Sequence, residues 1–150
     1  MRSSVSWRRE AWRQVFSVQV RPVPTGAVVL QLRGDLDVES VVQLDEAADA
    51  ALAPRPTPPL VVVDCASLSF CDSSGIGGLV RLYQRLSAQG GRLRLAAAPA
   101  SVAKAFSLTG LDGVIPVHTS TGDALAVARS GRDKVADAGE GTVVRGRGVG

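Results

Sequence analysis

The sequence has few of the side chains from which metal and disulfide-rich sites are built. Its 150 residues include two cysteines, Cys65 and Cys71, and one histidine, His118. These three side chains cannot complete an ordinary four-ligand zinc site, and two thiols are too few for a disulfide framework. We therefore interpret the cysteines as small apolar packing residues and His118 as structural, and we expect no metal and no cofactor.

Aromatic residues are also scarce, at 4% of the chain, and long apolar runs are missing. No run approaches the roughly 20 apolar residues that a membrane-spanning helix needs, so no transmembrane segment is expected. The arginines near the N-terminus are not followed by a continuous apolar segment, so the start does not read as a secretory signal and a cytoplasmic location is expected. The 45% of hydrophobic residues suits one globular domain.

The net charge of +3 comes from the ends of the chain. Residues 1–26 contain five arginines and one glutamate, whereas residues 27–128 contain seven basic and ten acidic residues. A nucleic-acid-binding domain would carry a basic face within its fold, together with stacking aromatics, so direct nucleic acid binding is not expected. We expect residues 1–14 to form a flexible N-terminal extension and residues 130–150 a flexible, glycine- and arginine-containing tail.

The most informative stretch runs Leu68-Ser-Phe-Cys-Asp-Ser-Ser-Gly-Ile-Gly-Gly-Leu79. A β-branched strand is predicted before it at residues 60–64, and apolar residues at helical spacing predict a helix over residues 74–88. Asp72 and Ser73 are therefore candidates for the helix N-cap. The unpaired N–H groups and the dipole of such a helix start favour an anion, including a phosphate attached to a serine of the loop.

Strand and helix patterns alternate along the rest of the chain. They predict an α/β fold with a central mixed, mainly parallel sheet of four to five strands and about four helices, the first two strands being antiparallel. The expected strands cover residues 16–21, 27–33, 60–64, 92–96 and 114–118. The expected helices cover residues 38–53, 74–88, a short segment from about 99 to 110, and a last segment from a capping box at 120–123 to about 129, with a proline-rich linker at 54–59.

Three motifs in this order resemble the STAS domain of bacterial anti-sigma factor antagonists. They are Gly34-Asp-Leu-Asp37, Leu68-Ser-Phe-Cys-Asp-Ser-Ser-Gly-Ile-Gly77 and Phe106-Ser-Leu-Thr-Gly-Leu111, and the likeness spans about residues 15–129. The resemblance implies that Ser73 is phosphorylated by a partner anti-sigma factor that is also a serine kinase. It further implies that the unphosphorylated form binds this factor and frees a sigma factor, and that a phosphatase of the PP2C type restores binding.

The same helix suggests a binding face. Helical spacing places Ser74, Gly78, Arg81 and Arg85 opposite the apolar residues, and glycines without side chains would let a partner backbone approach closely. Asp72 is expected to orient the Ser73 hydroxyl, and the resemblance places two further aspartates at the edge of this surface. The predicted partner-binding residues are Asp35, Asp37, Asp72, Ser74, Gly75, Gly77, Gly78, Arg81 and Arg85.

Simpler interpretations of the motifs stay open. In these interpretations Ser73 is only a helix cap, Gly34-Asp-Leu-Asp37 is a strand-to-helix turn with Asp37 as the cap, and Thr109-Gly110-Leu111 is a helix stop.

Catalysis is not expected. A serine hydrolase would need a glycine ahead of the serines at 73 and 74, which the sequence lacks, and a histidine base, for which His118 is the single histidine. The sequence also lacks the glycine-rich phosphate-binding loop that ends in a lysine. The remaining alternative is a non-catalytic STAS adaptor or scaffold subunit in another signalling or lipid-transport complex.

Overall fold

The computed structural model describes residues 15–53 and 59–130. The expected N-terminal extension, the proline-rich linker over residues 54–58 and residues 131–150 of the expected tail lie outside the described residues.

A five-stranded sheet forms the centre of the domain, and its strands follow one another across the sheet in chain order. The first pair is antiparallel and the other three pairs are parallel, which confirms the predicted mixed, mainly parallel sheet. The strands are β1 (Ser17–Pro22), β2 (Val28–Leu36), β3 (Leu60–Cys71), β4 (Arg92–Ala96) and β5 (Val117–His118).

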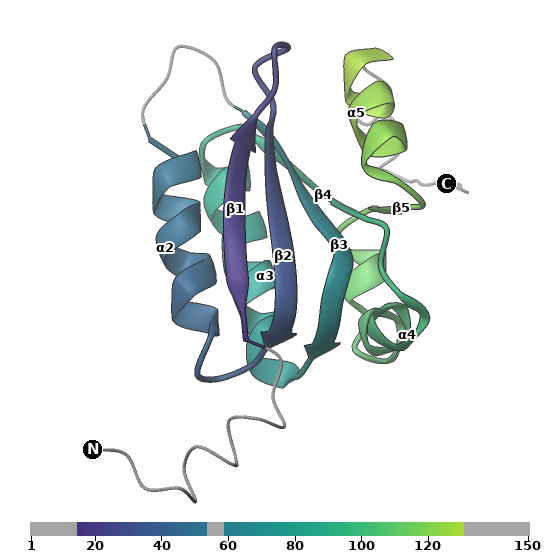
Figure 1. Cartoon of the computed structure of the whole chain (residues 1–150). Helices are drawn as coiled ribbons and strands as arrows, with labels where there is room; N and C mark the ends of the chain where they lie inside the picture. The colour runs from purple at the N-terminus through teal and green to yellow at the C-terminus, as the bar shows by residue number, and fades with distance from the viewer. Residues whose placement is uncertain (1–14, 54–58, 131–150) are drawn as a thin grey trace, which may run out of the picture.

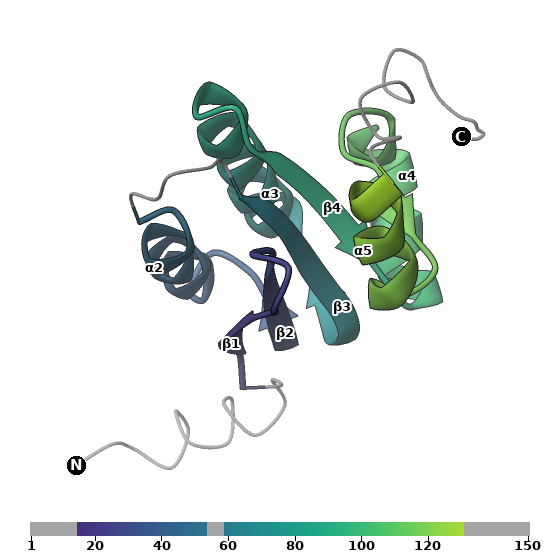
Figure 2. The same cartoon turned by 90° about the horizontal axis from the view of Figure 1, so that it is seen from above.

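Helices lie on both faces of the sheet, which makes the fold α/β as predicted (Figures 1 and 2). Helices α2 and α3 cover one face, whereas α5 lies over the β3, β4 and β5 part of the other, and α4 lies near the end of β3. The helices are α2 (Val41–Ala51), α3 (Ser73–Ala88), α4 (Ala100–Leu108) and α5 (Thr121–Ser130), with a short 3₁₀ turn, η1 (Leu111–Gly113).

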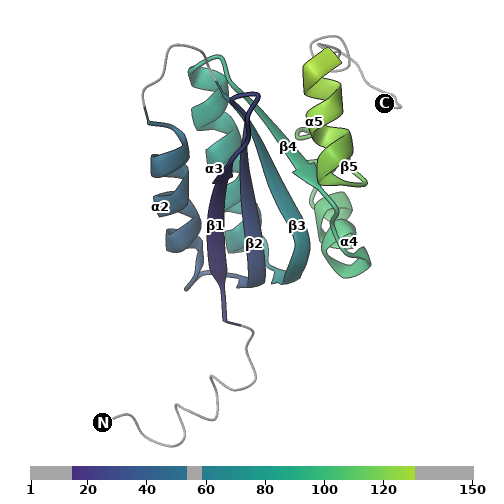
Figure 3. The ribbon, with the colours of Figure 1, turned by 45° about the horizontal axis from the view of Figure 1, so that its top comes forward.

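Alternating strand residues fill two separate cores. Val28, Leu30 and Leu32 pack with α2 and α3, while Val29 and Val62 pack on the opposite face with a smaller cluster that includes α5. Successive side chains of a strand point to opposite faces, and burial on both faces requires the nearly continuous apolar run that begins β3. No described helix covers the β1 and β2 part of the second face (Figure 3).

Strand β3 is longer than predicted and reaches the motif itself, ending at Cys71 and not at residue 64. Its pairing with β2 continues through two register shifts, the second next to Gly34, whose φ is +88°. These irregularities break the period-two pattern, so the sequence did not reveal the extension. Both strands therefore run to the carboxyl-terminal edge where the motifs lie.

Smaller differences concern the other elements. The helix expected from residue 38 begins at Val41, after a turn, and the strand expected over 114–118 comprises only Val117–His118, since η1 occupies the segment before it. The predicted helix stop is confirmed, because α4 ends at Leu108 and Gly110 has a φ of +78°. Among the described residues, no helix is both long and apolar enough to cross a bilayer.

Candidate functional site

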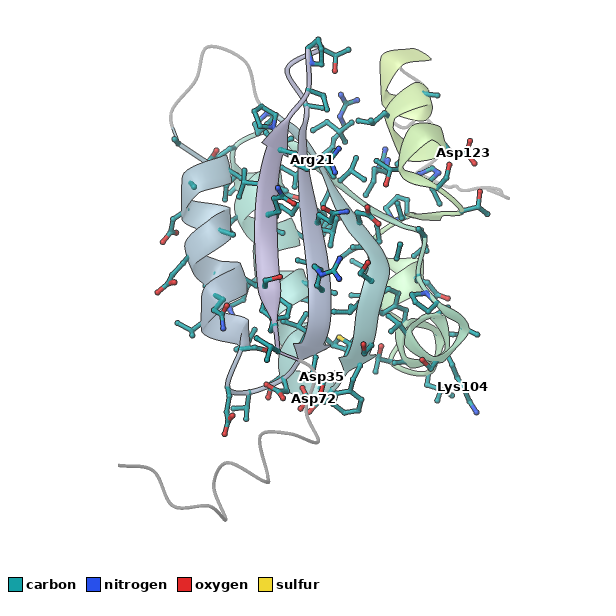
Figure 4. The ribbon with its side chains drawn as sticks, viewed as in Figure 1. Arg21, Asp35, Asp72, Lys104 and Asp123 are labelled. Atoms are coloured by element: carbon teal, nitrogen blue, oxygen red, sulfur yellow. The ribbon has the colours of Figure 1, made fainter. Side chains whose placement is uncertain are left out.

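The ends of β2 and β3 bring the first two sequence motifs together. The backbone N–H of Asp72 donates to the carbonyl oxygen of Leu36 at 3.2 Å, and Asp35 is the register partner of Phe70. Figure 4 shows Asp35 and Asp72 at the same end of the sheet, which lies far from Arg21 and Asp123. The carboxyl ends of parallel strands are where α/β folds commonly place their functional residues.

Asp72 is the N-cap of α3. Its Oδ1 accepts a hydrogen bond from the N–H of Gly75 at 3.1 Å, and its carbonyl accepts the N–H of Ile76 at 2.9 Å. Ser73 is the first residue of the helix and is exposed, and its hydroxyl has no hydrogen bond to another described residue. The interpretation of Ser73 as the cap is therefore wrong, and the Asp72 carboxylate binds the Gly75 N–H in place of orienting the Ser73 hydroxyl.

The start of α3 suits a negative charge at Ser73. The N–H groups of the first helical residues have no partner one turn earlier in the helix, and the aligned peptide dipoles make this end positive. The Asp72 side chain accepts a hydrogen bond from the N–H of Gly75. The backbone N–H groups of Ser73 and Ser74, which precede Gly75 in the helix, are not bonded by this side chain. An anion on the Ser73 side chain is thus compatible with the folded helix.

The turn before α2 is held by Asp37 and Ser40. Oδ1 of Asp37 accepts hydrogen bonds from the backbone N–H groups of Glu39 and Ser40, both at 3.1 Å. The Ser40 hydroxyl donates to the carbonyl of Asp35 at 2.7 Å and accepts the N–H of Asp37 at 2.9 Å. Asp37 thus stabilises the turn, whereas the N-cap of α2 is Ser40, so the interpretation of Asp37 as the helix cap is wrong. Sequence reasoning missed Ser40, which is buried at 3% exposure and fixes Asp35 relative to α2.

Two of the predicted partner-binding glycines are buried inside the chain. A Cβ atom on Gly75 would lie 2.7 Å from the carbonyl oxygen of Leu36, and one on Gly78 would lie 2.5 Å from Cγ2 of Val41. Both glycines therefore permit close packing within the domain. The prediction that Gly78 lies on the face opposite the core is wrong.

The buried side of α3 is rotated relative to the predicted one. Partly buried Ile76 and Tyr83 flank this side, and Leu82, which the apolar spacing left out, lies at its centre. The buried residues are Gly75, Gly78, Leu79, Leu82 and Leu86.

Gly77, Arg81 and Arg85 remain accessible, and the two arginines contact α2. Arg81 pairs with Asp45 at 3.2 Å and Arg85 with Asp49 at 2.7 Å. Exposed ion pairs of this kind contribute about 0–1 kcal/mol, so they fix the seam between two helices only weakly. Ser74 is half-buried beside Ser73 and also has no hydrogen bond from its side chain to a described residue.

The remaining candidate chemical groups are two cysteines and one histidine. Burial raises the pKa of the Cys65 and Cys71 thiols to about 12, so neither is a thiolate at neutral pH. Burial and the charge of Arg94 lower the pKa of His118, and Asp123 opposes this shift. Within the described residues, no group of three or more metal-ligating side chains was found.

Comparison with known proteins places the chain in a family. A family profile described as "Mlab, STAS domain" matches residues 22–117. The chain belongs to the STAS domain family.

Two of its relatives are described as anti-sigma factor antagonists. An anti-sigma F factor antagonist of Lysinibacillus sphaericus is 32% identical over 62% of this chain and 79% of the relative. The crystal structure of an anti-sigma factor antagonist from Mycobacterium paratuberculosis is 27% identical, with a TM-score of 0.68 over 77% of this chain and 95% of that one.

Two further solved structures carry the name SpoIIAA. The anti-sigma factor antagonist SpoIIAA in its unphosphorylated form is 27% identical, with a TM-score of 0.65 over 76% of this chain and 97% of that one. SpoIIAA of Bacillus has also been solved in its phosphorylated form, which is 26% identical with a TM-score of 0.59 over 75% of this chain and 99% of that one.

Proposed function

We propose that this protein is an anti-sigma factor antagonist controlled by phosphorylation of Ser73. In this proposal the unphosphorylated form binds an anti-sigma factor that is also a serine kinase, and a sigma factor is released. The kinase transfers a phosphoryl group from ATP to the Ser73 hydroxyl, and binding is lost. A phosphatase of the PP2C type hydrolyses the phosphoester and restores binding.

The observation that carries the proposal is the free hydroxyl of Ser73. It lies exposed at the first position of α3, and because Asp72 supplies the cap, the hydroxyl has no structural hydrogen bond to lose. A phosphoryl group would add roughly −1.5 to −2 charge at the positive end of the helix, so the fold is expected to survive modification.

The surface around Ser73 explains why binding would respond. The segments Gly34–Gln43 and Ser67–Val80 together contain four acidic residues and no basic residue. These segments thus offer no cation that could neutralise a phosphoryl group. Binding would require the dianion to be desolvated or the partner to move away, and either change weakens a close contact.

The protein acts in this scheme as a binding module without catalysis of its own, through a STAS domain over about residues 15–129 in the cytoplasm. The nine residues predicted to bind the partner are retained only in part. Gly75 and Gly78 are buried and support the surface from inside. The accessible residues remain candidates, and they are Asp35, Asp37, Asp72, Ser74, Gly77, Arg81 and Arg85.

The test is a comparison of phosphorylation and binding in matched variants of the full chain. The anti-sigma factor that co-purifies from the source cells is expected to phosphorylate the wild type and Ser74→Ala, and to bind Ser73→Ala without modifying it. Ser73→Glu should bind at least tenfold more weakly than Ser73→Ala. Phosphate mapped to Ser74, or equal binding by the phosphorylated and unphosphorylated wild type, would contradict the proposal.

An adaptor role in another complex is the second candidate. It is favoured by the description of the matching family profile, "Mlab, STAS domain", which does not mention sigma factors. A stable partner unrelated to sigma control, bound equally by Ser73→Ala and Ser73→Glu, would support this alternative.

A further inference from the structure

Phe70 is the exception among the three phenylalanines of the chain. Phe16 and Phe106 are 6% and 1% exposed in the core, whereas Phe70 is 50% exposed near the end of β3. Of its two neighbours along the strand, Ser69 is exposed and Cys71 is buried. Phe70 therefore contributes little to the core and leaves half of an aromatic ring in water.

The ring of Phe70 belongs to the same end of the sheet as Ser73. Phe70 is the register partner of Asp35 on the neighbouring parallel strand, so both side chains point to the same face of the sheet. Asp72, two residues further along, is tied to β2 by its hydrogen bond to Leu36. The aromatic ring thus lies at the rim that carries the free hydroxyl.

Two further apolar side chains are exposed at this end of the domain. Val38 is 69% exposed in the turn that follows β2, and Val42 is 52% exposed in the first turn of α2. Asp37 and Glu39 belong to the same turn as Val38, and Asp35 and Asp72 lie at this end of the sheet (Figure 4). An exposed apolar group with a polar border is typical of a protein interaction site, and aromatic side chains commonly dominate the binding energy of such sites.

We infer that Phe70 is the apolar anchor of the partner interface. Resting on the proposed function, this assigns to the anti-sigma factor a pocket for one aromatic ring. Ser73 supplies the switch in this arrangement and Phe70 supplies much of the affinity.

Site-specific photo-cross-linking in the source cells tests the location of the contact. Three variants of the full chain carry p-benzoylphenylalanine, in place of Phe70, of Val42, or of Leu108. Leu108 is 76% exposed on α4 and serves as the matched control. We expect position 70 to cross-link an anti-sigma factor and position 108 not to do so. Capture of that factor from position 42 but not from position 70 would overturn the anchor and leave the proposed function standing. Capture from position 70 of a protein without a role in sigma control would overturn the proposed function instead.

Binding measurements with the purified, cross-link-identified protein test the energetic role. Phe70→Ala should weaken binding about 30-fold, as truncation of an aromatic hot spot does. Phe70→Leu should lose less, and Leu108→Ala should stay within twofold of the wild type. Because half of Phe70 is buried, Phe70→Ala should lower the unfolding midpoint somewhat but leave the protein folded under the conditions of the binding measurement. A Phe70→Ala variant that binds within threefold of the wild type would refute the inference, whichever protein the partner is.

Discussion

Gly77 and Gly78 are neighbours in α3, yet alanine should have opposite effects at the two positions. At Gly77 the new Cβ would meet only Nη1 of Arg81, at 3.7 Å, which is an ordinary contact. Alanine is favoured over glycine in a helix interior by about 0.8–1 kcal/mol, so Gly77→Ala should raise the free energy of unfolding by up to this amount.

At Gly78 the new Cβ would lie 2.5 Å from Cγ2 of Val41, and so short a separation between a Cβ and another heavy atom is essentially never seen in real structures. Val41 is β-branched and restricted about χ1, so α2 must move or the valine must leave its preferred rotamer. Overpacking of this kind costs about 1–3 kcal/mol, and the helix propensity of alanine offsets up to about 1 kcal/mol of it. We expect Gly78→Ala to lower the free energy of unfolding by about 1 kcal/mol.

Urea unfolding followed by circular dichroism measures both variants on the same scale. A third variant isolates the contact: Val41→Ala removes Cγ2, so adding Gly78→Ala to it should be stabilising, as Gly77→Ala is in the wild type. The coupling between positions 41 and 78 should then be about 1–2 kcal/mol. If Gly78→Ala stabilises the otherwise unchanged protein as much as Gly77→Ala does, then α2 does not lie against α3 as described.

Three further predictions concern the cap, the histidine and the thiols. Asp72→Ala should lower the free energy of unfolding by about 1 kcal/mol, because the Gly75 N–H loses its acceptor. Asp72→Asn should lose only a small part of this stability, and an equal loss in both variants would count against the cap. The free energy of unfolding should fall as the pH is lowered below the ordinary histidine pKa of 6.5. The reason is that burial lowers the pKa of His118 in the folded chain, so the unfolded chain binds the extra proton. His118→Gln should flatten this pH dependence, and an unchanged slope would show that other groups cause it. Cys65 and Cys71 should react with an aromatic disulfide reagent at neutral pH only in the presence of denaturant, since their pKa values are about 12; rapid reaction of the folded protein would contradict their burial.

The sequence was sufficient to predict the order of strands and helices because apolar spacing and glycine or proline breaks carry that information. It was also sufficient to predict that Ser73 lies where a strand ends and a helix begins. The length of β3 was not predictable in this way. Burial of Cys65, Leu68 and Cys71 follows a period of three, and the register shifts that produce this pattern are formed with β2, which is distant in the chain.

The environments of individual residues on α3 were harder to predict than the helix itself. Glycine has no hydropathy signal that separates a partner-facing position from a packed one, and Gly78 is packed only because Val41 of another helix lies against it. The arginines looked available for a partner because their aspartates lie on α2, 36 residues earlier in each case. Phe70 was part of the quoted motif but was not singled out, because an aromatic residue in a strand is usually buried.

The assignment of the helix cap to Asp72 has a consequence for how this protein can change over time. Position 73 is under no architectural constraint from α3, so the residue there can be replaced without loss of the domain. Under the proposed phosphorylation of Ser73, replacement by a residue that lacks a hydroxyl would yield an intact protein fixed in one signalling state, whereas replacement of Asp72 would weaken the domain in every state. Selection could then remove or restore the proposed switch through a single codon while the scaffold stays the same.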